Sequence, residues 1–206
     1  MNKTYSDDLA YVREVAESGA SAPLLGGRFL VWWGTLVTLA YIGHYAILKG
    51  FAGLGMDALG IMWIAFIVIA LAGHFAMIFL FSRDKPGASS AGNRASATVW
   101  MASGMVLFSF FAGVVIKSVL DGTASVGFNW SIPLVLGVYG ISQLVSGQMS
   151  GSRGLTVAGW GGIVFVGITA IMMGTAELYL AAAAAAAMIV LVPGIIMLRD
   201  EPSTTV

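Results

Sequence analysis

The chain has 206 residues, of which 58% are hydrophobic and only 10% are charged. A soluble domain carries about 25% charged residues because water must wet its surface, so a surface of this composition must face lipid. Ten basic and ten acidic residues balance, which gives no indication of a nucleic-acid partner. The absence of cysteine excludes disulfides, thiolate metal sites and a cysteine nucleophile.

Residues 1–27 are expected to form a short, weakly amphipathic helix and a linker. Ser6 can cap this helix and Gly19 can end it. The segment lacks the apolar core of a secretory signal. Its four acidic residues outweigh Lys3 and Arg13, which suits an anionic lipid surface poorly. We therefore expect this arm to bind a protein partner.

Six apolar segments follow, each about 20 residues long, the length that crosses a hydrocarbon core of ~30 Å. They predict an all-α integral membrane bundle in one transmembrane domain, 28–198, with a tail at 199–206. The 83–96 segment, rich in Gly, Ser and Ala, is expected to be a flexible loop. The predicted spans are 28–49, 58–82, 97–119, 128–148, 155–174 and 177–198.

Lysine and arginine gather on one side of these spans. Eight basic residues fall in the arm, in the 83–96 segment, between the fourth and fifth spans, and after the sixth. Only Lys49 and Lys117 fall on the other side. Because loops facing the cytoplasm carry the excess of basic residues, we expect a multi-pass protein of the cell (inner) membrane with both termini in the cytoplasm.

The fourth and sixth spans carry packing signals. Seven alanines, Ala181–Ala187, allow helices to approach closely, and Pro193 is expected to kink the sixth helix. Serines recur every four residues at 142, 146 and 150, which places them on one face. We expect this face to join helices by hydrogen bonds, with a solute pathway as the alternative. The candidate polar residues of the fourth span are Tyr139, Ser142, Gln143 and Ser146.

A tryptophan lies near the start of four spans, at positions 33, 63, 130 and 160. Small residues follow each one after seven and ten positions and are expected to permit helix packing. The spacing predicts a candidate 3+3 inverted repeat, a pattern found in transporters. Similar helix lengths and abundant Gly and Ala are the alternative explanation. The packing positions are Ala40, Gly43, Ala70, Gly73, Gly137, Gly140, Gly167 and Ala170.

The only histidines, His44 and His74, lie in the similar pieces GHYAI and GHFAM. Each shares a helix face with the small residues of its span, and each has three candidate roles: proton relay, haem ligation and structural hydrogen bonding. A proton relay would lack a membrane-buried acid. The expected depths of His44 and His74 in the membrane differ by ~9 Å, which disfavours the binding of one haem by both. Structural hydrogen bonding is favoured, with Thr38, Tyr41 and Tyr45 as hydroxyl neighbours of His44.

No motif of a hydrolase, a nucleotide-binding loop or a zinc enzyme is present. We therefore expect neither catalysis nor a cofactor nor a metal. The leading hypothesis is a regulatory, scaffold or accessory membrane subunit that acts through a protein partner or as a homo-oligomer. The alternative is a small-solute or proton-linked transporter that uses the small-residue faces with His44 and His74.

Overall fold

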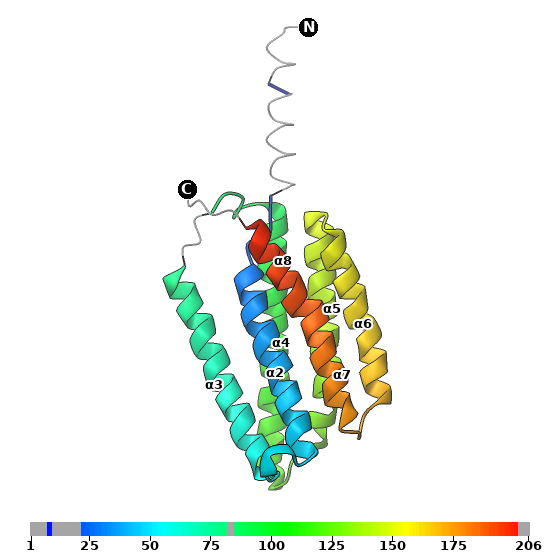
Figure 1. The fold of residues 1–206 in the computed structure, drawn as a ribbon. Helices are drawn as coiled ribbons and strands as arrows, with labels where there is room; N and C mark the ends of the chain where they lie inside the picture. Colours follow the sequence, from blue (N-terminus) through cyan, green and yellow to red (C-terminus); the bar gives the residue numbers. More distant parts are fainter. Residues whose placement is uncertain (1–7, 10–21, 82–84, 202–206) are drawn as a thin grey trace.

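The structure, a computed structural model, describes residues 8–9, 22–81 and 85–201, and it is an all-helical bundle (Figure 1). Six helical segments are long and apolar enough to cross a membrane, which confirms the predicted fold class. They are α2 Gly27–Leu48, α3 Asp57–Leu80, α4 Ala91–Asp121, α5 Ser131–Ser150, α6 Arg153–Ile171, and the sixth span, made of α7 Glu177–Ala186, η3 Ala187–Leu191 and α8 Val192–Asp200. Apart from Asp8 and Leu9, the helix predicted within residues 1–20 lies outside the described residues.

We call the end of the bundle where α2 begins and α8 finishes the terminal end (Figure 1). Residues 85–90, which precede α4, and the turn that joins α5 to α6 lie there too (Figure 1). The opposite end holds two 3₁₀ turns, η1 Phe51–Gly53 and η2 Val126–Trp130, and the turn before α7. All described basic residues except Lys49 and Lys117 therefore belong to the terminal end.

Helix α4 begins earlier than predicted, at Ala91 rather than at 97. The Ser90 side chain caps it by accepting a hydrogen bond from the backbone N–H of Asn93, which is the usual role of serine at this position. The helix has 31 residues and so extends ~46 Å at ~1.5 Å per residue, longer than a ~30 Å core. Its first turns can therefore be polar, which is why they resembled a loop.

Helix α2 packs closely against the second half of the sixth span, η3 and α8, at glycines that lie against the backbone of the opposite helix. A Cβ added to Gly27 would lie 2.5 Å from the Leu198 nitrogen, and one added to Gly194 would lie 2.7 Å from Leu30 Cβ. At Gly34 it would lie 2.7 Å from the Leu191 nitrogen. Further along the sixth span, four of the seven predicted alanines are almost fully buried. Small residues thus let the last span lie against the first, as expected of close helix pairs in membranes.

Helices α5 and α6 cross in the same manner. A Cβ on Gly162 would lie 2.7 Å from the Gly140 Cα, and one on Gly159 would lie 2.7 Å from the Leu144 nitrogen. At Gly147 the nearest atom, the Thr156 nitrogen, would be at 2.6 Å. Neither helix can carry larger side chains on this seam without moving apart.

Helix α3 lies at one edge of the bundle beside α2 (Figure 1), and Ala70 is its one buried residue. Here a side chain fills the space above a glycine: a Cβ at Gly73 would lie 2.1 Å from Trp32 Cζ2. The Trp32 indole also donates to the Ala70 carbonyl at 3.1 Å. The pair α2–α3 is therefore joined by aromatic side chains, whereas α5–α6 is joined backbone to backbone.

Candidate functional site

The two histidines accept hydrogen bonds from tryptophans of the neighbouring span. Trp63 Nε1 donates to His44 Nδ1 at 3.1 Å, and Trp33 Nε1 donates to His74 Nδ1 at 3.2 Å. In each helix the histidine follows the tryptophan by eleven residues, about three turns. Because α2 and α3 are antiparallel, this equal spacing makes both pairs meet. We call these two contacts the Trp–His pairs.

His44 also lies against the last span. Its ring stacks on Tyr179 of α7 with 3.6 Å between centroids and 17° between planes. Tyr41, 4% exposed, packs its ring against both Trp63 and Tyr179. The hydroxyl neighbours are therefore not the hydrogen-bond partners of His44: its donor is the Trp63 indole, and the Thr38 hydroxyl oxygen is buried without a partner.

An ion pair joins α2 to α7 at the opposite end of the bundle, two residues from Tyr179. Lys49 Nζ lies 2.6 Å from Glu177 Oε1, and both side chains are partly exposed. The hydrogen bond to Glu177 raises the pKa of Lys49 above its usual value. Glu177 is the first residue of α7, where a negative charge is favoured by the helix dipole.

The polar face of α5 makes hydrogen bonds to α4. The Ser146 hydroxyl lies 2.9 Å from that of Ser96, and the Ser142 hydroxyl lies 2.7 Å from that of Ser103. On the same two helices, the ring of Tyr139 packs against Trp100. Ser142 and Ser146 are at most 1% exposed. These serines hold two helices together, which favours the hydrogen-bonding interpretation over a solute pathway.

Gln143 reaches the distorted part of the sixth span. Pro193 has no N–H, so the carbonyl four residues earlier, that of Ile189, cannot receive the usual helical hydrogen bond. The Gln143 side chain donates to this carbonyl from Nε2 at 2.6 Å. The predicted distortion takes the form of a π-helical segment just before the proline. Gln143 is fully buried, and its Oε1 has no partner.

The predicted packing positions differ in what they contact. A Cβ at Gly43 would lie 3.0 Å from Met62 Sδ, and one at Gly137 would lie 3.3 Å from Val166 Cγ2. Ala40 is buried, while Ala170 is half-buried. The expectation of close packing at Gly167 is wrong, since nothing lies within 4 Å of an added Cβ. Helix α6 meets α5 through Gly159 and Gly162 instead.

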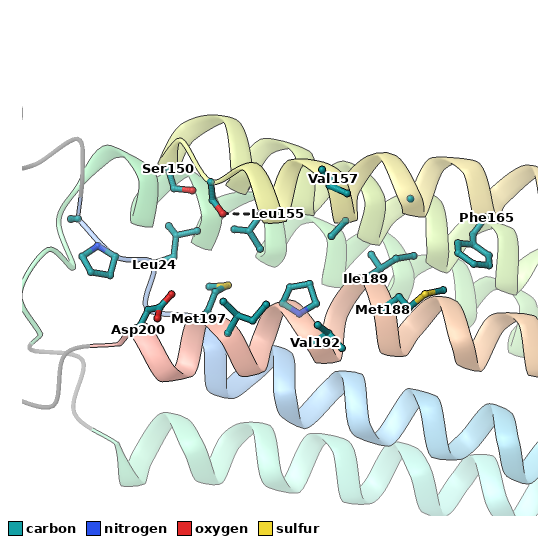
Figure 2. Close-up of a pocket in the computed structure, with 18 residues that line it drawn as sticks. Leu24, Ser150, Leu155, Val157, Phe165, Met188, Ile189, Val192, Met197 and Asp200 are labelled. Atoms are coloured by element: carbon teal, nitrogen blue, oxygen red, sulfur yellow. Dashed lines mark hydrogen bonds between the residues drawn. The ribbon is translucent and has the colours of Figure 1, made fainter.

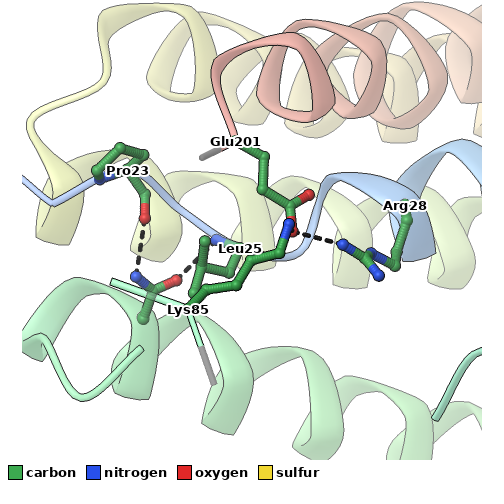
Figure 3. A network of polar contacts seen from close by, with 6 residues as sticks. Pro23, Leu25, Arg28, Lys85 and Glu201 are labelled. Atoms are coloured by element: carbon green, nitrogen blue, oxygen red, sulfur yellow. Dashed lines mark hydrogen bonds and ion pairs between the residues drawn. The ribbon is translucent and has the colours of Figure 1, made fainter. Parts of the chain in front are cut away.

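A polar cluster at the terminal end holds residues 22–25, which we call the arm root because they connect the N-terminal arm to α2 (Figure 3). Asn93 of α4, 9% exposed, accepts from the Leu25 backbone N–H at 2.8 Å through Oδ1 and donates to the Pro23 carbonyl at 2.9 Å through Nδ2. The same Nδ2 lies 3.0 Å from the Gly87 carbonyl and 3.2 Å from Ser90 Oγ. One side chain thus links arm root, turn and helix.

Glu201, just after α8, completes this cluster. Its Oε1 accepts from Arg28 Nη2 and from Lys85 Nζ, both at 2.7 Å, and its side chain is only 3% exposed. Arg28 also lies over the Phe81 ring, 4.5 Å from its centroid. The second carboxylate oxygen, Oε2, is buried without a partner. We call Arg28, Lys85, Asn93 and Glu201 the terminal-end cluster. Sequence reasoning missed Asn93 and Glu201 because neither lies in an apolar span.

Among the described residues, no group of three His, Asp or Glu side chains is placed to hold a metal ion. The helices define a multi-pass, all-α membrane protein. Comparison of the chain with protein-family models, curated proteins and solved structures found no match.

Proposed function

We propose that this protein is a non-enzymatic membrane subunit that binds a protein partner through its N-terminal arm, in a regulatory, scaffold or accessory role. The observation that carries the proposal is the fastening of the arm root by Asn93. A linker without a role in positioning the arm would not need a buried side chain to hold both a backbone N–H and a carbonyl of the arm root.

The charge and shape of the two ends support the same proposal. The arm carries four acidic residues, which suit a basic protein surface better than anionic lipid. At the opposite end, the segments between α2 and α3, between α4 and α5 and between α6 and α7 have eight, nine and five residues, so they offer little surface to a soluble partner. The basic residues of the terminal end favour the cytoplasm, and we place the partner there.

The test compares three variants of the full-length protein in native membranes. We expect deletion of residues 1–20 to leave membrane abundance unchanged and to abolish recovery of a stoichiometric partner. Asn93→Ala, which releases the arm root, should reduce that recovery several-fold. Thr98→Val is the matched control, because the Thr98 hydroxyl donates only to the Arg94 carbonyl of its own helix in the contacts described. An unchanged set of co-purifying proteins after the deletion would contradict the proposal.

A small-solute or proton-linked carrier is the second candidate. It would need the small-residue faces and the histidines to line a pathway. The contacts of these faces favour packing, because Trp32 covers Gly73 and α6 covers Gly140. Both histidines, moreover, are engaged by tryptophans. Purified protein in vesicles with a pH gradient should therefore show no protein-dependent proton flux, and a flux abolished by His44→Gln would support the carrier instead.

A further inference from the structure

A cavity of about 560 Å³ lies between α6 and the sixth span, toward the terminal end (Figure 2). Its volume falls in the range of small-molecule sites, about 300–1,000 Å³. Leu155 of α6 and Ile189 and Met197 of the sixth span line its interior, and Phe165 and Met188 line the part farthest from the terminal end. The polar lining residues Ser150, Ser152 and Asp200 lie near the terminal end. The cavity is therefore apolar along its length and polar at one end.

The cavity opens toward lipid. Val157 and Ile196, on the two helices that border it, line the cavity and are 71% and 53% exposed. In a bilayer the fluid at this opening is hydrocarbon. An empty space of this size would lose the dispersion contacts of its walls, and an apolar cavity does not hold water. Hydrocarbon is the material that fits.

Two glycines of α6 keep the space open. An added Cβ at Gly161 would have nothing within 4 Å, and at Gly154 only Ser152 Oγ, at 4.0 Å. Both residues line the cavity. Gly159 and Gly162, on the same helix, are needed for the crossing with α5. Helix α6 thus has one set of glycines for packing and another that borders the cavity.

We propose that this cavity binds one acyl chain of a bilayer phospholipid from the leaflet at the terminal end. Phe165 of α6 lies thirteen residues after Ser152, the N-cap of that helix, which corresponds to ~20 Å at ~1.5 Å per residue. Half of a bilayer, with its headgroup region, is ~20–22 Å, so the cavity, measured from its polar end, has the depth of one leaflet. Its polar end lies where the headgroup of such a lipid must lie. The Asp200 carboxylate there favours a headgroup that carries an ammonium.

The arm root forms part of the cavity wall. Ala22, Pro23 and Leu24 line it, and the Pro23 carbonyl is held by Asn93. A bound chain therefore contacts the segment that positions the arm. Any effect of the lipid on partner binding rests on the proposed function, but chain binding itself is measured on the purified protein without a partner. The two proposals can therefore fail separately.

The test uses full-length protein in nanodiscs of phosphatidylethanolamine and phosphatidylglycerol. A trace of phosphatidylethanolamine carries a photoreactive diazirine at the end of one acyl chain. We expect saturable labelling at Phe165 and Met188, and one phospholipid per chain retained in detergent by native mass spectrometry. Gly161→Leu fills the cavity and should reduce both signals at least tenfold. Gly167→Leu is the matched control: this glycine also has open space around it but does not line the cavity.

Three results would overturn the proposal. One is equal lipid retention by Gly161→Leu and the unmodified protein, with both folded by near-ultraviolet circular dichroism. The second is labelling at the cavity that rises without saturation, as expected of lipids that merely surround the bundle. The third is saturable labelling by a diazirine fatty acid but not by the phospholipid. If Gly161→Leu does not fold, Ala158→Leu, at another lining position, fills the same space.

Discussion

The hydrogen bond between Gln143 and the Ile189 carbonyl predicts a coupling between Gln143 and Pro193 that can be measured. Gln143→Leu removes the donor that lies 2.6 Å from this carbonyl, and a buried unpartnered carbonyl costs about 1–3 kcal/mol. The same substitution removes the buried, unpartnered Oε1, which offsets a cost of the same order. The two effects oppose each other, so we expect the single variant to change the free energy of unfolding by only about 1 kcal/mol.

Pro193→Ala should change this balance. Alanine restores an N–H four residues after Ile189, so the carbonyl no longer depends on Gln143. The double variant should be more stable than the sum of the two single effects by about 1 kcal/mol, a value within the range measured for polar contacts in membranes. The Oε1 contribution cancels in this cycle, because that atom is removed in both backgrounds.

Reversible unfolding in lipid bicelles would measure the four free energies. Pro133→Ala is a suitable control background, because Pro133 lies in the first turn of α5, where no helical N–H is required. Additive effects of Gln143→Leu and Pro193→Ala would refute the assignment of Gln143 as the substitute donor, since independent sites do not couple.

Three further predictions concern packing, the Trp–His pairs and orientation. Gly140→Val should separate α5 from α6 and destabilise the protein by about 1–3 kcal/mol, whereas Gly167→Val should be nearly neutral by thermal unfolding; equal effects would contradict the α5–α6 crossing. A cycle of Trp33→Phe and His74→Leu should show coupling of about 0.6 kcal/mol or more, with His74→Asn milder than His74→Leu, and zero coupling would argue against the hydrogen bond. Topology reporters after Val206 and within 83–96 should be cytoplasmic and one near residue 123 exported, and an exported C-terminal reporter would reverse the orientation.

Much of the fold could be predicted from the sequence because bilayer thickness fixes the length of an apolar helix. The serine face of α5 was equally accessible, since its four-residue spacing places Ser142 and Ser146 on one side whatever the neighbour is. What the spacing cannot give is the identity of that neighbour. Ser96 and Ser103 lie seven residues apart on α4 and meet this face only because the two helices are antiparallel.

To predict the hydrogen-bond partners of the histidines, one would also need to know which helices lie side by side. The sequence contained a usable signal: two consecutive spans, joined by a short segment, both carry a tryptophan eleven residues before a histidine. Antiparallel packing of such spans makes each indole meet the other imidazole. The hydroxyl neighbours seemed the better partners because they are close in sequence, but residues on one helix face point toward another helix.

The tryptophan pattern has different physical causes in the two halves of the chain. Trp33 and Trp63 are partly buried and donate hydrogen bonds across α2 and α3. Trp130 and Trp160 are each 59% exposed, as expected of the aromatic belt that faces lipid headgroups or chains. The equal spacing thus joins residues with unlike contacts, and the candidate inverted repeat gains no support from their packing.

These contacts imply that some pairs of neighbouring helices are packed more tightly than others. Glycines that lie against the backbone of the opposite helix join α2 to α8 and α5 to α6. Separating either pair would expose many packed atoms at once. Helix α3 has a single buried residue and is joined to α2 by indole rings and their hydrogen bonds. Cooperative units with few buried contacts open at lower free energy. The Trp–His pairs therefore add hydrogen bonds between α2 and α3, the pair of helices that should separate most easily. This stabilisation is a structural reason for two imidazoles within the apolar spans.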